Sequence, residues 1–243
     1  MERRENDIVY IVGKGSIWLD NELRYSLRSL ERHIKNYRKV FIVGHLPPFI
    51  NPESVVHIPV ESTSKDKAIN IKNKLMAVCD HPDVSPYFMF MNDDYFFMSD
   101  IDATSYPYFW KCDLTHTLEI NKSLYREHVA STIRALSLKG LPLKNFDVHK
   151  PIIYSKNKLT NIVYQYDWSI RPAYVMKSIY CNTDGIEGVQ RADDKQTCPM
   201  SIQRWRDKFT GVDCFSIDDK CINLHFKNFM AETFPDRSRF ELF

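Results

Sequence analysis

Glycine is scarce in this sequence. Only 7 of the 243 residues are glycine, whereas a protein of this length has about 17 on average. The sequence contains neither the G-x-x-x-x-G-K-[ST] phosphate-binding loop nor the G-x-G-x-x-G dinucleotide-binding loop. These absences disfavour small P-loop ATPases, the common types of kinase and Rossmann dehydrogenases.

Two other patterns are missing. None of the six cysteines forms a C-x-x-C pair, so we expect reduced thiols and no structural zinc site. No apolar stretch reaches the ~18 residues of a membrane span, and the beginning of the chain lacks the apolar region of a signal peptide. The formal net charge of +2 is too small to indicate nucleic-acid binding by itself. We therefore expect a cytoplasmic protein.

The order of apolar segments predicts an α/β fold. Strands are expected at 8–12, 40–43, 55–60 and 87–91, where β-branched and aromatic residues follow one another. Helices are expected at 22–37 and, after a capping box at Thr63-x-x-Asp66, to about residue 79. This alternation is typical of a mostly parallel sheet flanked by helices. The rest of the chain is less regular and rich in aromatic residues, with helices expected at 124–137 and 201–208.

The segment Asn92-Asp93-Asp94 directly follows the last expected strand. Ligands of open α/β sheets bind outside the carboxyl ends of the strands. Two adjacent carboxylates repel each other unless a cation or a basic group lies between them. Mg²⁺ or Mn²⁺ held by Asp93 and Asp94 would remove that repulsion and could bridge to a diphosphate. The alternative is a simple turn or helix cap.

Two pairs of residues are further candidates. Asn70 and Lys74 are four residues apart and share a helix face, from which they could reach a nucleotide; a solvated face would have the same pattern. Asp147 and His149 project to one side of an extended segment, where the acid could orient the imidazole for acid–base catalysis.

Two later segments also carry candidate residues. In the segment 191–195, Arg191 and Lys195 could hold phosphate and Asp194 could act as a base, or the segment could be an ordinary polar loop. His225, in the segment 222–226, follows an expected strand and is a candidate metal ligand, although a core histidine is the commoner explanation.

Several segments resemble the Stealth-type sugar-phosphate transferases. They are DIVYIVG (7–13), ELRYSLRSL (22–30), YFMFMNDDYFF (87–97) and FDVHKP (146–151). The segment FPDRSRFE (234–241) is similar to the ends of short phage and bacterial glycosyltransferase-like proteins.

The resemblance implies a GT-A-like core that binds a nucleotide-diphosphate sugar, with Mn²⁺ or Mg²⁺ held by Asp93 and Asp94. It also implies that Arg24 and Arg28 face the donor phosphates or nucleotide and that His149 lies at the reacting centre. Stealth proteins typically have Trp-Val-x-Gly where this chain has VGKGS (12–16). Transfer of the sugar and transfer of the sugar-1-phosphate therefore both stay open.

We predict that residues 1–243 form a single-domain, metal-dependent glycosyltransferase with a UDP-sugar as the expected donor. Residues 1–100 would bind the nucleotide sugar and residues 101–243 would form the acceptor side. The predicted catalytic residues are Asp147, His149 and Asp194; the predicted donor-binding residues are Arg24, Arg28, Asn70, Lys74, Asn92 and Lys195; and the predicted metal ligands are Asp93, Asp94 and His225.

The acceptor is expected to be a hydroxyl group of a glycan or of a hydroxymethylated DNA base modified by a phage enzyme. In the second case Trp205 and the basic residues around it would contact the DNA. Three alternatives share the same residues: a Stealth-type sugar-1-phosphate transferase acting on a glycan, a non-catalytic sugar- or nucleotide-binding module, and a metal-dependent nuclease or phosphatase.

Overall fold

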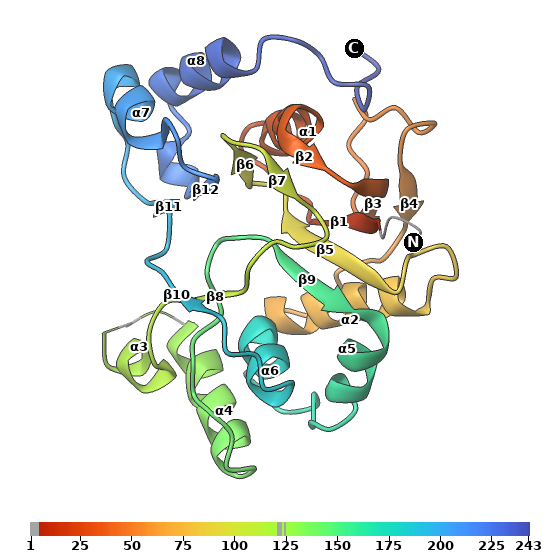
Figure 1. Ribbon diagram of the computed structural model, residues 1–243, viewed down its shortest axis with the longest axis vertical. Coiled ribbons are helices and arrows are strands. Elements are labelled where there is room, and N and C mark those ends of the chain that lie inside the picture. The colour runs from red at the N-terminus through yellow and green to blue at the C-terminus, as the bar shows by residue number, and fades with distance from the viewer. Residues whose placement is uncertain (1–4, 121–122, 124) are drawn as a thin grey trace.

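A computed structural model describes residues 5–120, 123 and 125–243 (Figure 1). At its centre is a five-stranded sheet in the order β4-β3-β1-β5-β9. The strands are β1 (Asn6–Val12), β3 (Tyr37–Gly44), β4 (Val56–Ile58), β5 (Tyr87–Asn92) and β9 (Ile152–Ser155). The first four are mutually parallel, and β9 runs antiparallel to β5. This confirms the expected α/β fold with a mostly parallel sheet.

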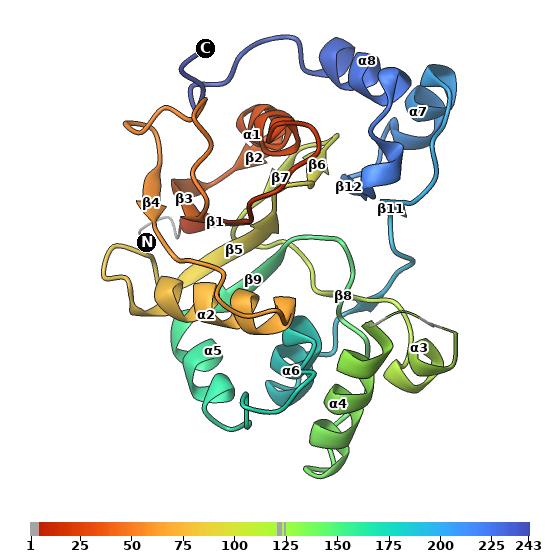
Figure 2. The same ribbon diagram turned by 180° about the vertical axis from the view of Figure 1, so that it is seen from behind.

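Helices cover both faces of this sheet, as Figures 1 and 2 show. Alternate residues of each strand point to opposite faces. On one face Val9, Phe41 and Phe88 pack with residues of α2 (Lys67–Asp80), α5 (Lys156–Val163) and α6 (Met176–Thr183). On the other face Ile8, Ile42 and Met89 pack against the leucines of α1 (Asn21–His33).

The remaining elements lie around the sheet. The short strands are β2 (Ile34–Lys35), β6 (Phe96–Phe97), β7 (Ile101–Asp102), β8 (Phe109–Trp110), β10 (Val189–Gln190), β11 (Lys195–Gln196) and β12 (Cys214–Ile217). The helices are α3 (Leu114–Ile120), α4 (Tyr125–Ser137), α7 (Ile202–Phe209), the 3₁₀ turn Asp219–Cys221 and α8 (Leu224–Thr233). Helices α7 and α8 enclose a third core around the fully buried Trp205.

Two predicted element boundaries are wrong. Helix α1 ends at His33 because Ile34 is extended and pairs with β7. Helix α2 begins at Lys67 and is capped by Asp66, whose carboxylate accepts the N–H of Ala68, so Thr63 does not cap it. His225 lies in α8.

The two helices expected later in the chain are present. The expected start of α4, Leu124, lies outside the described residues, and α4 itself runs over Tyr125–Ser137. Helix α7 begins one residue later than expected, because Ser201 caps it through a hydrogen bond from the N–H of Arg204. None of the described helices is both long and apolar enough to cross a lipid bilayer.

Gly44 ends β3 in a conformation that requires glycine. Its φ is +106°, and a Cβ here would lie 2.4 Å from the backbone oxygen of Val12 and 2.8 Å from Nζ of Lys74. A side chain would therefore push β3 away from the end of β1.

We expect Gly44→Ala to lower the free energy of unfolding by at least about 2 kcal/mol, since it adds both backbone strain and a clash. Gly15→Ala places an alanine at a positive φ of +102°, but its Cβ would have no atom within 4 Å. Gly13→Ala introduces neither backbone strain nor a clash. Urea denaturation of the three variants checks this, and an equal loss in Gly44→Ala and Gly15→Ala would show that the clash has no effect.

Candidate functional site

The carboxyl ends of the parallel strands meet at one edge of the sheet, where α/β proteins bind ligands. Strand β9 places Ile152 opposite Phe90, near the end of β5. Because β9 is antiparallel to β5, the residues that precede β9 lie at the same edge as the residues that follow β5. His149 is thereby brought close enough to Asp94 for its charge to act on that carboxyl group.

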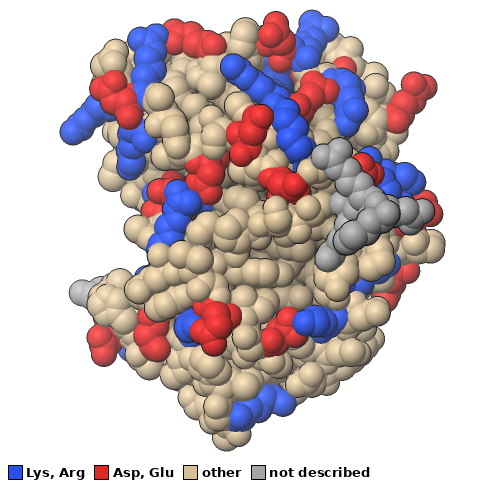
Figure 3. Space-filling view, viewed as in Figure 1, with Lys and Arg blue, Asp and Glu red and all other residues tan. Residues whose placement is uncertain are grey.

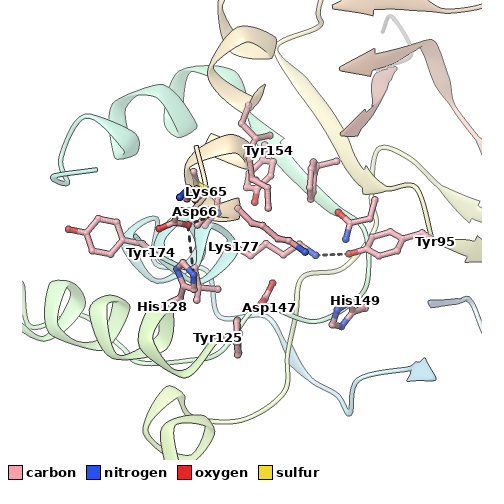
Figure 4. Close-up of a pocket in the computed structure, with 18 residues that line it drawn as sticks. Lys65, Asp66, Tyr95, Tyr125, His128, Asp147, His149, Tyr154, Tyr174 and Lys177 are labelled. Atoms are coloured by element: carbon pink, nitrogen blue, oxygen red, sulfur yellow. Dashed lines mark hydrogen bonds and ion pairs between the residues drawn. The ribbon is translucent and has the colours of Figure 1, made fainter. Parts of the chain in front are cut away.

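Two hollows open at this edge. The edge hollow, of about 940 Å³, lies beyond the ends of β1, β3 and β4; Lys14, His45, His57, Asn70 and Lys74 are among the residues that line it. The aromatic pocket, of about 470 Å³, is lined by residues that include Phe90, Tyr95, Tyr125, Asp147, His149, Tyr154, Tyr174 and Lys177 (Figure 4). Lys65, Lys67, Ile71 and Asn92 line both. The hollows are therefore neighbours with a shared rim.

Asp93 and Asp94 form a partly buried acidic pair. Burial, together with the charges of Asp94 and Glu22, raises the pKa of Asp93 to about 7. Burial also raises the pKa of Asp94, although Lys195 and His149 lower it. The pair therefore has a basic side, toward Asp94, and an acidic side, toward Asp93.

The chemistry of this pair fits a hard divalent cation. Carboxylate oxygens are the ligands that Mg²⁺ and Mn²⁺ prefer, and a cation would offset the repulsion from Asp94 that helps to raise the pKa of Asp93. Among the described residues, no three His, Cys, Asp or Glu side chains form a metal-binding group. His225, exposed on α8, therefore does not complete a three-ligand site with this pair, and further ligands would have to come from a substrate or water.

His149 is oriented by Asp193. Its Nδ1 lies 2.7 Å from Oδ2 of Asp193, and its backbone N–H donates to Oδ1 of the same residue. Burial raises the pKa of Asp193, but the hydrogen bond and charge of His149 outweigh burial and hold that pKa below its usual range. With Nδ1–H donating to Asp193, Nε2 is left as the acceptor nitrogen, 3.4 Å from Nζ of Lys195.

Two of the predicted catalytic acids have other partners. Asp147 was expected to orient His149 but instead lines the aromatic pocket beside Tyr125, whose pKa it raises after the larger effect of burial. Asp194 was expected to be a base, but it forms ion pairs with Lys150 at 2.7 Å and Arg191 at 3.1 Å. The acid that orients His149 is therefore Asp193 rather than the predicted Asp147.

Two buried lysines hold the segment that carries His149. Lys177, on α6, donates to the backbone oxygens of Val148 and Lys150 at 2.8 Å each and to the hydroxyl of Tyr95 at 3.1 Å. Lys150 forms an ion pair with Asp213 at 2.7 Å and also donates to the backbone oxygen of Cys214. Neither lysine was predicted, because no local pattern distinguishes a buried lysine from an exposed one.

The predicted donor-binding residues of α2 line the edge hollow, but both already have backbone partners. Lys74 donates to the backbone oxygen of Val12 at 2.8 Å, and burial lowers its pKa. Asn70 exchanges two hydrogen bonds with the backbone of Ser64. Both side chains therefore shape the hollow. Asn92, the third of these predicted residues near the hollows, lies on the shared rim.

Arg24 and Arg28 lie in neither hollow. Both pair with the buried carboxylate of Glu241, at 2.7 and 2.8 Å, and Arg24 also donates to the backbone oxygen of Phe243. The structure therefore does not place these two arginines at the predicted donor site. They bind the last described segment of the chain to α1 instead.

The sequence comparisons with known proteins give no match. No family model matches this chain, and no curated protein matches it. Among solved structures, a crystal structure of 4-diphosphocytidyl-2C-methyl-D-erythritol synthase is similar at 11% sequence identity and a TM-score of 0.37, covering 79% of this chain and 90% of that chain. The assignment of this chain to the α/β class rests on the topology of its own sheet.

The raised pKa of Asp93 makes the stability of the metal-free protein depend on pH. The folded protein holds this proton up to about pH 7, whereas the unfolded chain loses it near the ordinary value of 3.8. Between these values the folded state binds more protons, so the free energy of unfolding falls as the pH rises. We expect Asp93→Asn to reduce this fall.

Urea denaturation from about pH 5 to pH 8 in the presence of a chelator measures the slope. Asp80→Asn, at the C-terminal end of α2, is the control and should keep the slope of the natural protein. An unchanged slope in Asp93→Asn would show that this carboxyl group is not the one that titrates.

Proposed function

We propose that this chain is a metal-dependent transferase that uses a nucleoside-diphosphate sugar as donor. The observation that carries the proposal is the acidic pair at the end of β5, with one side facing His149 and Lys195. Parallel α/β sheets bind nucleotides at this edge. The scarcity of glycine fits as well, because a metal and side-chain cations need no glycine-rich loop to approach phosphate.

The two hollows suggest how such a donor would lie. The nucleoside would occupy the edge hollow, and the diphosphate would cross the shared rim beside Lys65, Lys67 and Asn92. A cation held by Asp93 and Asp94 would neutralise the negative charge that develops on the leaving phosphate.

His149 is the residue best placed to act as the general base. In glycosyl transfer, the acceptor oxygen forms a bond to the anomeric carbon, the bond from that carbon to the diphosphate breaks, and the acceptor proton moves to Nε2 of His149. The carboxylate of Asp193 stabilises the imidazolium that results. Phosphate on the rim would give Lys195 a charged partner and free Nε2 to accept the proton.

Transfer of a sugar-1-phosphate, as the resemblance to Stealth-type proteins suggests, would use the same groups. The difference lies in the product: transfer of the sugar releases a nucleoside diphosphate, and transfer of the sugar-1-phosphate releases a nucleoside monophosphate. Chromatography of the nucleotide product therefore separates the two reactions.

Three of the residues on which a DNA acceptor was argued have other contacts in the structure. Trp205 is fully buried, Arg206 pairs with Glu232 at 2.5 Å and Lys208 donates to Gln196. In the described part of the face in Figure 3, Lys and Arg are interspersed with Asp and Glu rather than joined in one basic area. A glycan hydroxyl is the acceptor that we retain.

The proposal is tested by thermal unfolding of the chelator-treated protein with UDP or a UDP-sugar, with and without Mn²⁺. We expect the nucleotide to raise the unfolding temperature only when Mn²⁺ is present, because binding to the folded state stabilises it. Asp94→Asn should lose this rise, and Asp80→Asn should keep it. A rise without Mn²⁺, or none in a panel of nucleotide sugars, would contradict the proposal.

The role of His149 makes a separate prediction. Asp193→Asn should lower kcat by about 10²- to 10⁴-fold, because the imidazole loses the group that fixes its tautomer and orientation. Binding of the UDP-sugar with Mn²⁺ should stay close to that of the natural protein. Steady-state kinetics measure both effects, with Asp184→Asn, which loses an ion pair with the exposed Lys158, as the control. An unchanged kcat would remove His149 as the base.

A further inference from the structure

The aromatic pocket contains a buried polar group that has no hydrogen-bond partner in the described part of the chain. Tyr154 belongs to β9 and is 0% exposed. Its hydroxyl oxygen has no hydrogen-bond partner among the described residues. Figure 4 shows the ring reaching into the pocket with its hydroxyl on the side of Lys177. An unpartnered buried hydroxyl costs about 1–3 kcal/mol, so a ligand that pairs with it would recover that free energy.

The walls of the pocket suit a ring with apolar faces. Phe90, Tyr95, Tyr154 and Tyr174 line it together with Ile71, Leu75 and Val175. Polar side chains also line it, among them Asp66, Asn92, His128, Asp147 and His149. A volume of about 470 Å³ lies within the range of small-molecule sites, in which a few polar groups orient a ligand held by apolar contacts.

The charges of the pocket disfavour an anionic ligand at its floor. The ammonium group of Lys177 has three donors, and all three are used by Val148, Lys150 and Tyr95. Asp147 adds a carboxylate. The exposed Lys65 and Lys67 lie on the shared rim instead, so phosphate fits the rim, and a neutral ligand with hydroxyl groups fits the floor.

We propose that the aromatic pocket binds the neutral, hydroxylated six-membered ring of a sugar, with its face against the aromatic side chains and one hydroxyl paired with Tyr154. The proposal deepens the proposed function, since it names what lies beside His149. The ring has two possible sources, the sugar of the donor and a sugar unit of the acceptor, and they share the same chemistry.

Tyr154→Phe tests the proposal because it removes only the hydroxyl. In the free protein the unfolding temperature should stay the same or rise, since an unpaired buried group is lost. Binding of the sugar should weaken by about threefold to tenfold, the value of one neutral hydrogen bond.

Tyr10→Phe is the matched control. Tyr10 is equally buried, but its hydroxyl pairs with Ser26 at 2.9 Å, on the other face of the sheet. This variant should lower the unfolding temperature and leave sugar binding unchanged. If Tyr154→Phe lowers the unfolding temperature as much as Tyr10→Phe, the hydroxyl of Tyr154 already has a partner and the proposal is wrong.

Calorimetric titrations identify the source of the ring. The probes are UDP, UDP-glucose, UDP-galactose and UDP-N-acetylglucosamine with Mn²⁺, and the methyl glycosides of the same sugars with and without UDP. A UDP-sugar that binds tighter than UDP, with a gain that Tyr154→Phe reduces, supports the donor sugar. A methyl glycoside whose binding Tyr154→Phe weakens supports the acceptor sugar.

The failures of the two proposals are distinguishable. Binding of a methyl glycoside without any binding of UDP would retain the sugar pocket and reject the nucleotide donor. Metal-dependent UDP binding to which no sugar adds affinity, with no binding of any methyl glycoside, would retain the donor site and overturn the sugar pocket. If Tyr154→Phe weakens the binding of UDP as much as the binding of the UDP-sugar, the sugar pocket is also overturned, because the pocket would then hold the nucleoside.

Discussion

The antiparallel pairing of β9 with β5 is the constraint on which the candidate site depends. Strand β5 delivers Asp93 and Asp94 to the carboxyl edge of the sheet, and the opposite direction of β9 brings the residues before it, including His149, to the same edge. A parallel strand at this position would have placed those residues at the far edge. The same strand also carries Tyr154 into the aromatic pocket, which His149 lines as well.

Buried charge keeps this arrangement in place. Lys177 holds the backbone on both sides of His149, and the cost of removing its charge from water is offset by three hydrogen bonds. Asp193 fixes the imidazole from another segment of the chain. The positive charges of Lys195, His149 and Lys177 lower the pKa of Asp94, whereas Asp93 faces mainly acids. An added cation is therefore attracted most strongly at Asp93.

The four parallel strands of the sheet could be predicted because they are apolar runs, whose burial depends little on the rest of the chain, whereas β9 was not predicted. The acidic pair could be predicted as well, because it follows such a run directly. The partners of these groups could not be predicted, because they are distant in sequence: Asp193 is 44 residues from His149, and Glu241 is 217 residues from Arg24. Local spacing suggested Asp147 as the partner of His149, and the family resemblance suggested a phosphate as the partner of Arg24. Likewise, the buried hydroxyl of Tyr154 gives no sequence signal, because only packing decides whether it has a partner.

The central claim is that a divalent cation bound by Asp93 and Asp94 holds the diphosphate of a nucleotide at the end of β5. An anomalous difference map from a crystal grown with Mn²⁺ and UDP measures the position of the metal directly. The account predicts a manganese peak about 2.1–2.2 Å from a carboxylate oxygen of this pair, with the diphosphate as its other ligand and the uridine in the edge hollow. A manganese peak elsewhere, or a diphosphate bound without contact to these two residues, would contradict it.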